Sequence, residues 1–334
     1  MREFTVLSII LFYIFTILTD CYILRDILSY CRYRKKAAVW SYSVSSVLFW
    51  GLVTVIAFWP AARESSSLIP LMWMIYTYFS VYVSKLLYVV FSAVGRLFRS
   101  KRKGRRVNYG VYAGIPLSLV AFIFMWWGAL FTRNEIVVEN VTVVSGRLPQ
   151  KFNGYRIVQF SDAHVGTWGN DTSFVSRLVD RINSLDPDLI VFTGDVVNRE
   201  TSEMEPFLSV LSRLKARDGV YSVLGNHDYG DYMDWSFPSE RDSNNALMRM
   251  WQRQIGWRML NNGHTFISRQ GDSIALIGVE NWGEPPFRQY GRLAEAYSGN
   301  SESASNLRDG RFKILLSPNP EHWNREVSNT TALD

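Results

Sequence analysis

Cysteine and histidine are scarce in this chain of 334 residues. It contains two cysteines, Cys21 and Cys31, and four histidines. Because no cysteine follows residue 31, the rest of the chain can form neither a disulfide framework nor a thiolate metal site. Any metal bound there must therefore be held by aspartate, asparagine and histidine.

The C-terminal part also lacks an excess of basic residues, although the net charge of the chain is +6. Twelve of the 36 lysines and arginines lie in two short segments, residues 25–36 and 96–106. Without them, 24 basic residues face 30 acidic ones, a net charge of −6. The isoelectric point of 9.2 therefore gives no reason to expect nucleic-acid binding, and the basic segments are typical of loops beside membrane helices.

Long apolar runs are confined to the first 131 residues. Four of them have roughly the 20 residues that a helix needs to cross a bilayer, and they cover residues 4–24, 38–59, 68–91 and 109–131. Their number and the basic loops between them argue against buried helices of a soluble protein. The first run has no small-residue cleavage site, and Asp20 directly before Cys21 does not fit a lipoprotein signal. We therefore predict a transmembrane region of four helices over residues 1–133.

Two charged residues, Asp20 and Lys85, interrupt the first and third runs. Such charges face the interior of a helix bundle or snorkel to an interface. We expect snorkelling here, because a transporter hypothesis would rest on these two charges alone.

The distribution of basic residues also predicts the orientation. The loops after the first and third runs are basic, whereas the loop at residues 60–67 has only Arg63, with Glu64 beside it. Basic loops remain in the cytoplasm. We therefore expect a multi-pass protein of the cell membrane whose C-terminal domain, residues 134–334, is extracytoplasmic.

In this C-terminal part, short apolar runs alternate with amphipathic helical patterns, which is typical of an α/β domain. An edge strand is predicted at residues 136–144, and buried strands at 155–161, 189–193 and 220–224. A hairpin is predicted from residues 265–268 and 273–278, and a last strand at 312–317. Helices are predicted at residues 173–184, 205–214 and 245–255, whereas the polar residues 281–310 are expected to be loop.

A polar motif follows each of the three buried strands. The motifs contain Asp162 and His164, then Asp195, then Asn226 and His227. Each motif alone is common, since Gly-Asp is a routine turn and Asn-His-Asp fits a helix cap. Ligand sites of open α/β sheets lie beyond the carboxyl ends of the strands. Three motifs in order at three strand ends therefore predict one shared site.

The side chains of these motifs suit divalent metal ions, because carboxylate, amide oxygen and imidazole bind hard or borderline cations. Asp195 has two carboxylate oxygens and could bridge two ions about 3.5–4 Å apart, as in two-metal phosphatases. His227 follows Asn226 but should point elsewhere. It is the natural proton donor, or charge stabiliser, for a leaving oxygen.

The three motifs resemble the calcineurin-like metallophosphoesterase superfamily, in particular its membrane-attached bacterial branch. The matching segments are FSDAHVG at residues 160–166, FTGDVVN at 192–198 and LGNHD at 224–228. The resemblance covers residues 136–334 and implies a sandwich of two mixed β-sheets flanked by helices.

The resemblance also implies the ligand set. One ion would be held by Asp162, His164 and Asp195, and a second by Asp195 and Asn226. His227 would be the catalytic histidine near the scissile phosphate. The two divalent ions would be Mn, Fe, Zn or Mg.

The chain departs from the family pattern in its histidines. Pro318 stands where members have a histidine ligand of the second metal, and the final Gly-His-x-His motif is absent. His264 is expected at the surface of a turn. His322 is expected to be a structural residue at a helix start, and its service as a replacement ligand is the alternative.

The final residues, 329–334, resemble the approach to the family's last core strand. We therefore expect that this chain is an incomplete copy of the domain. It should bind the first ion weakly and the second hardly at all, and its hydrolytic activity should be low or absent. The alternative is a complete chain that recruits His322 as a ligand.

The sequence thus predicts metal-dependent hydrolysis of phosphomonoesters or phosphodiesters by a two-metal-activated water at the extracytoplasmic membrane face. The expected partners are the lipid bilayer and a phosphorylated small-molecule or lipid-linked substrate, such as a nucleotide sugar. The rival hypothesis is a non-catalytic membrane sensor or scaffold that keeps the fold. Pro318 favours the rival, whereas the three intact motifs favour the enzyme.

Overall fold

The computed structural model describes residues 6–31, 33–59, 68–98, 100–102, 105–283, 288–298 and 310–328. The chain divides into two compact units, Arg2–Val137 and Val138–Asp334. The loop at residues 60–67 and the segment at residues 329–334, which carry two of the expectations from the sequence, lie outside the described residues.

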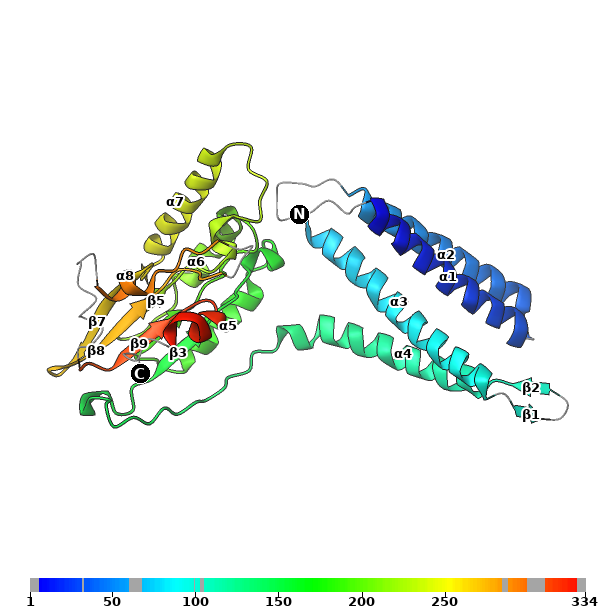
Figure 1. Ribbon diagram of the computed structural model, residues 1–334, viewed down its shortest axis with the longest axis horizontal. Coiled ribbons are helices and arrows are strands. Elements are labelled where there is room, and N and C mark those ends of the chain that lie inside the picture. Colours follow the sequence, from blue (N-terminus) through cyan, green and yellow to red (C-terminus); the bar gives the residue numbers. More distant parts are fainter. Residues whose placement is uncertain are drawn as a thin grey trace. The chain divides into compact units, whose positions relative to one another are not determined.

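The N-terminal unit contains the helices α1 (Val6–Tyr30), α2 (Lys35–Ala57), α3 (Leu68–Leu97) and α4 (Tyr109–Leu130). A short antiparallel hairpin, β1 (Ser100–Arg102) and β2 (Arg105–Val107), joins α3 to α4 (Figure 1). Among the described residues, three helices are long and apolar enough to cross a membrane: α2, α3, and α4 extended to Asn134. Large apolar side chains such as Leu48 and Phe124 are about 70% exposed on them, as lipid-facing side chains would be.

Helices α3 and α4 approach closely because small residues line their contact. A Cβ atom on Gly110 would lie 2.8 Å from the carbonyl carbon of Phe91 and 2.9 Å from the Cα of Gly95. Gly114, four residues along α4, faces Phe91 in the same way. This small-xxx-small spacing lets helix backbones meet in a membrane, where packing replaces the hydrophobic effect.

A buried carboxylate ties three helices together. Asp20 of α1 accepts hydrogen bonds from Tyr42 (2.7 Å) and Trp50 (3.0 Å) of α2, and from Tyr82 (2.8 Å) of α3. The Lys85 ammonium pairs with it at 2.7 Å and lies over the Tyr82 ring. Asp20 is 3% exposed, so the expectation that these charges snorkel is wrong. They neutralise each other inside the bundle.

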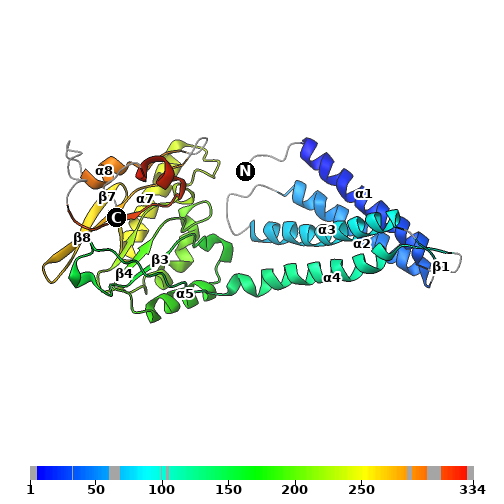
Figure 2. The same cartoon turned by 60° about the horizontal axis from the view of Figure 1, so that its bottom comes forward.

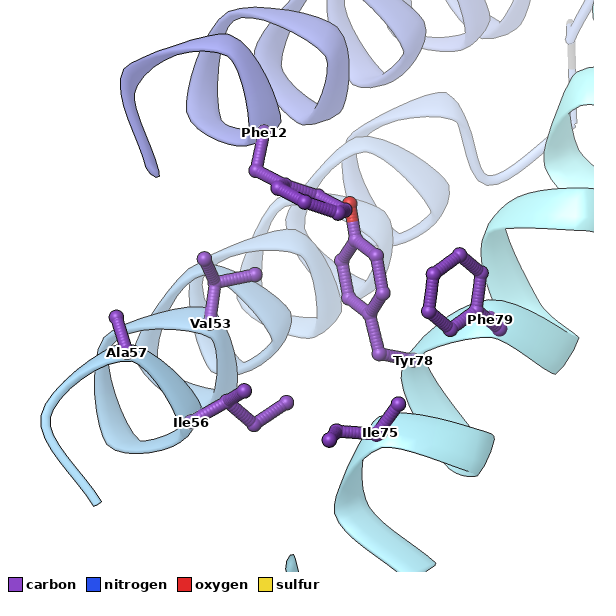
Figure 3. Close-up of a pocket in the computed structure, with 7 residues that line it drawn as sticks. All are labelled: Phe12, Val53, Ile56, Ala57, Ile75, Tyr78 and Phe79. Carbon is purple, nitrogen blue, oxygen red and sulfur yellow. The ribbon is translucent and has the colours of Figure 1, made fainter. Parts of the chain in front are cut away.

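An apolar cavity of about 60 Å³ lies between α1, α2 and α3 (Figure 3). Its lining residues are Phe12, Val53, Ile56, Ala57, Ile75, Tyr78 and Phe79. A lining of this kind can hold hydrocarbon. Its one hydroxyl, that of Tyr78, is already hydrogen-bonded to Thr16 at 2.7 Å.

The C-terminal unit is built around two sheets (Figure 2). The first is parallel and has the order β3 (Ile157–Phe160), β4 (Leu189–Phe192), β5 (Val220–Ser222), β6 (Trp257–Met259). The second contains β7 (Gly263–Arg269) antiparallel to β8 (Asp272–Gly278), and β9 (Lys313–Leu316) parallel to β8. The helices are α5 (Ser173–Ser184), α6 (Leu208–Leu211), α7 (Pro238–Gln254) and α8 (Leu293–Ser298).

Strand β4 shows how the core is built. Its side chains alternate between two faces, as in any strand, yet all four are buried. Ile190 and Phe192 pack in one apolar cluster with residues of α5, α6 and α7. Leu189 and Val191 pack in a second cluster with residues of β7, β8 and β9. A strand covered on both faces needs an uninterrupted apolar run, which is what LIVF supplies.

The end of the parallel sheet opposite the polar motifs is fixed by Asp188. Its carboxylate accepts from the Arg156 N–H at 2.9 Å and pairs with Arg217 at 2.9 Å and Arg269 at 3.1 Å. Burial raises the pKa of this carboxyl, but the Arg156 N–H and the two guanidinium groups together outweigh burial and hold the pKa below its usual value.

Two strand predictions need correction. Residues 136–144 form no strand, and Val141 and Val144 are 84% and 91% exposed. Their alternating pattern suits a strand, but they have no ladder partner among the described residues. The run at residues 155–161 gives β3, which is an edge strand with alternating exposure rather than a buried one.

The remaining elements follow the sequence more closely. The predicted hairpin is confirmed as β7 and β8, with Gln270 and Gly271 both at positive φ in a two-residue turn. The last strand is confirmed as β9. Residues 205–214 contain only the end of a 3₁₀ segment and the short α6, and residues 281–310 include α8 rather than loop alone.

Candidate metal centre at the strand ends

The three polar motifs lie at the carboxyl ends of the neighbouring parallel strands β3, β4 and β5. The loops after β3 and β4 are joined by hydrogen bonds from Asp162 N to Gly194 O (2.9 Å) and from His164 N to Asp195 O (3.1 Å). Asp162, His164 and Asp195 all have φ between 39° and 63°. Such left-handed backbone is costly for non-glycine residues and is typical of functional sites.

Glycine permits the loops after β4 and β5 to touch. Gly194 has φ 103°, and a Cβ atom on it would lie 2.5 Å from the Gly225 nitrogen. A side chain at this position would therefore separate the two loops.

Two imidazole rings enter the site in a fixed orientation. The Nδ1 of His164 is 3.1 Å from the Val197 carbonyl oxygen, and the Nδ1 of His227 is 2.6 Å from that of Asn198. A carbonyl oxygen only accepts, so each Nδ1 carries a proton and donates. In the neutral ring Nε2 would carry a lone pair, as in metal-ligating histidines, and in the protonated ring Nε2 would donate. The two rings lie edge to face, 4.7 Å apart.

The structure brings His164, Asp195 and His227 together, with one potential ligand atom from each within 4.8 Å of the others. Burial raises the pKa of the Asp195 carboxyl; the nearby Asp162 adds to this, while the His227 N–H and the two imidazoles oppose it. A partly buried carboxylate with a raised pKa is a group that a cation would stabilise.

Asp162 lies at the edge of this group. One carboxylate oxygen is 3.7 Å from the His164 Nε2, and the other accepts from the Ser161 hydroxyl at 2.6 Å. Its side chain is 64% exposed, so it faces the open side of the site.

Asn226 is held by a residue outside the motifs. Its amide nitrogen donates to the Tyr232 hydroxyl at 2.7 Å. The contact with Tyr232 engages only the amide nitrogen, so the amide oxygen, which is the atom that would bind an ion, is not used by it. Tyr232 also stacks on His227, with ring centroids 4.4 Å apart. Sequence reasoning missed Tyr232, because no pattern marks it.

A second residue missed as a functional candidate is Asp228, although it stands in LGNHD. It is fully buried and accepts hydrogen bonds from the N–H groups of Asp195 (2.9 Å), Val196 (2.8 Å) and Gly225 (3.0 Å). Burial, with the nearby Asp195 charge, raises its pKa to about 7. Asp228 thus holds two loops together and does not face the site.

The other histidines do not join the group. His322 is buried, and its two ring nitrogens contact the Ser317 hydroxyl (3.0 Å) and Glu326 (2.8 Å). It is therefore structural in this arrangement. His264 lies on the strand β7 rather than in the expected turn, half-buried, with Nδ1 3.0 Å from the Ala296 carbonyl oxygen.

Pro318 lies beside the site, as its position in the motif predicts. Its Cβ is 3.2 Å from where a Cβ on Gly194 would stand. The pyrrolidine ring has no ligand atom, so this side of the site receives no donor from residue 318.

Comparisons with known proteins identify the family. Residues 155–331 match the family described as "Calcineurin-like phosphoesterase". Residues 2–133 match the family described as "Probable Calcineurin-like phosphoesterase, transmembrane domain". The resemblance stated from the motifs is thereby confirmed.

Several curated proteins are similar to this chain. A transmembrane protein with metallophosphoesterase domain from Danio rerio is 28% identical over 60% of the chain and 45% of its own length. A UDP-2,3-diacylglucosamine pyrophosphatase from Chlamydia trachomatis is 37% identical over 38% of the chain and 39% of its own length. An uncharacterized metallophosphoesterase from Bacillus subtilis is 30% identical over 54% of the chain and 56% of its own length.

The matches thus span between 39% and 56% of these relatives. The phosphoesterase match alone, by contrast, covers more than half of this chain. The chain is a membrane protein that belongs to the calcineurin-like phosphoesterase family of metal-dependent hydrolases.

Proposed function

We propose that this chain hydrolyses phosphomonoesters or phosphodiesters with two divalent ions at the extracytoplasmic face of a membrane. In this proposal all four N-terminal helices cross the bilayer, and the two sheets form the sandwich that carries the site. The observation that carries the proposal is the convergence of His164, Asp195 and His227 at the ends of parallel strands.

The residues present fit a metal centre. His164 and His227 have Nε2 free of the carbonyl contacts that fix Nδ1, and the pKa of Asp195 is raised by burial. Asp162, His164 and Asp195 would hold one ion, and Asp195 and Asn226 would hold the other. When bound, the ions would withdraw charge from the phosphoryl oxygens and lower the pKa of the attacking water.

The protein's own contribution is orientation and proton transfer. The backbone N–H of His227 donates to the Asp195 carboxylate at 2.8 Å and so fixes the rotamer of Asp195. The His227 ring, held by the Asn198 carbonyl oxygen, would place Nε2 beside the leaving oxygen. There a protonated Nε2 would donate its proton as the ester bond breaks.

The substrate class follows from the membrane setting and from one relative. The Chlamydia relative is named for hydrolysis of a pyrophosphate in a lipid-modified nucleotide sugar. We therefore place a lipid-linked phosphoester or pyrophosphate first among substrates, and water-soluble phosphoesters second.

One observation supports the alternative of a non-catalytic sensor or scaffold. Pro318 stands beside Gly194 and supplies no ligand, so the second ion would have only Asp195 and Asn226 from the described residues. The metal content of the purified chain separates the two functions, because a sensor that has lost its metals binds neither ion.

The activity test uses the full chain in detergent with Mn²⁺, on a generic phosphodiester and a generic monoester. Hydrolysis that needs Mn²⁺ and that Asp195→Asn abolishes is expected. Asp186→Asn is the matched control, since Asp186 is an exposed aspartate at positive φ that pairs with Arg217 outside the site. No Mn²⁺-dependent turnover, or equal loss in both variants, would contradict the proposed function.

The orientation has its own support and test. Tyr22 and Asp26 of α1 contact Ser92 and Arg96 of α3, so the basic segments after α1 and α3 lie at the same end of the bundle. A reporter enzyme that is active only in the cytoplasm, fused after Arg133, is expected to be silent. A strong signal would overturn the orientation.

A further inference from the structure

We infer that Tyr232 is a positioning residue that sets both Asn226 and His227, the hydroxyl acting on the first and the ring on the second. The inference rests on the proposed two-metal function. It concerns a residue that lies outside the LGNHD motif, in the loop that follows it.

The hydroxyl of Tyr232 holds the Asn226 amide in place. An asparagine can turn its amide so that either oxygen or nitrogen faces a given neighbour. Here the nitrogen donates to the Tyr232 oxygen at 2.7 Å, and the oxygen takes the opposite branch. An amide oxygen binds a cation, whereas an amide nitrogen does not. In this arrangement the Tyr232 hydroxyl holds the amide nitrogen in place, and the amide oxygen of Asn226 remains available as a ligand.

The ring of Tyr232 fixes His227 by a different contact. The two rings are stacked, with centroids 4.4 Å apart and planes inclined by 24°. The His164 ring meets His227 edge-on, and the Asn198 carbonyl oxygen holds Nδ1. The hydrogen bond at Nδ1 leaves rotation of the imidazole about that contact open, and the stacked ring closes this freedom.

The two contacts can be separated by substitution. Tyr232→Phe removes the hydroxyl and keeps the ring, whereas Tyr232→Leu removes both. Tyr155→Phe is the matched control, because it removes a hydroxyl that donates to Asp218 at 2.6 Å. Tyr155 lies two residues before β3, away from the carboxyl ends of the strands.

The first measurement is binding of Mn²⁺ to the full chain in detergent, followed by the paramagnetic resonance signal of the free ion. Loss of a residue that orients a metal ligand weakens metal affinity about 10–100-fold. Tyr232→Phe is expected to lower the affinity for one of the two Mn²⁺ ions by that factor and to leave the affinity for the other unchanged. Tyr155→Phe is expected to leave both affinities unchanged. Unchanged affinity for both ions in Tyr232→Phe would overturn the role of the hydroxyl.

The second measurement needs no metal. The chain has four histidines, so ¹⁵N-histidine labelling gives four ring systems whose shifts report the tautomer. Tyr232→Leu is expected to abolish the single Nδ1–H tautomer of His227 and to leave His264 and His322 unaltered, whereas Tyr232→Phe keeps it. An unaltered His227 in Tyr232→Leu would overturn the role of the ring. A wild-type chain that binds only one ion would contradict the two-metal function. In that case the histidine spectra would still test the role of the Tyr232 ring, because they require no metal.

Discussion

Replacing Gly225 by alanine tests the geometry of the metal centre most directly. A Cβ atom at this position would lie 2.7 Å from both the Cγ and the backbone nitrogen of Asp195, where ordinary contacts begin near 3.4 Å. Gly225 is not among the residues at positive φ, so alanine is allowed by its backbone and the effect is purely steric. The Asp195 carboxylate must therefore shift by roughly 1 Å, and misplacement of that size costs about 100-fold in activity.

The assay compares Mn²⁺ affinity and phosphodiester hydrolysis of Gly225→Ala with those of Gly146→Ala. A Cβ atom on Gly146 would meet nothing within 4 Å, so this control should match the wild type. Circular dichroism and thermal unfolding show whether both variants fold. A folded Gly225→Ala protein that binds Mn²⁺ as tightly as the wild type would refute the assigned geometry.

Three further predictions concern stability, measured as unfolding of the full chain in detergent, with Gly128→Ala as the control because a Cβ there meets no atom within 4 Å. Gly110→Ala should cost about 1–3 kcal/mol through overpacking of α3 against α4, and equal stability of the two glycine variants would contradict the close approach. Asp20→Ala should cost about 3–5 kcal/mol because Lys85 is left unpaired inside the bundle; a loss below about 1 kcal/mol would argue against the buried pair. The folded pKa of Asp188 is lowered, so its stabilisation is complete above its unfolded value near 3.8 and is lost as pH falls through the folded value. Asp188→Asn should therefore weaken the C-terminal unit at neutral pH by about 1.5–3 kcal/mol and flatten its acid unfolding profile, and an unchanged profile would contradict that assignment.

Two of the three strands that position the site, β4 and β5, could be found from the sequence because their burial requires apolar residues. A strand covered on both faces, such as β4, must be apolar at every position, and its end is where polar residues resume. Parallel neighbours then place Asp162, Asp195 and Asn226 at one edge of the sheet. Their side-chain directions could not be found this way, because the Asn226 amide is set by Tyr232, six residues away in an irregular loop.

Two of the wrong predictions share a cause, which is that pairing is not local. Residues 136–144 alternate as a strand requires, but a ladder also needs a neighbouring strand, which a local pattern cannot supply. The partners of Asp20 likewise lie on other helices, the most distant being Lys85. A window of a dozen residues shows the charge but not the group that neutralises it.

The buried Asp228 carboxylate joins the loops after β4 and β5. The backbone N–H groups of Asp195 and Val196, in the loop after β4, and of Gly225, in the loop after β5, all donate to this one side chain. A motion that displaces Asp228 would therefore release all three. Hydrogen exchange at the three amides should then occur in one cooperative event rather than by separate fraying of each loop. If only the loop after β4 were grafted onto another sheet, the N–H groups of Asp195 and Val196 would lose their acceptor. If only the loop after β5 were grafted, the Asp228 carboxylate would lose these two donors.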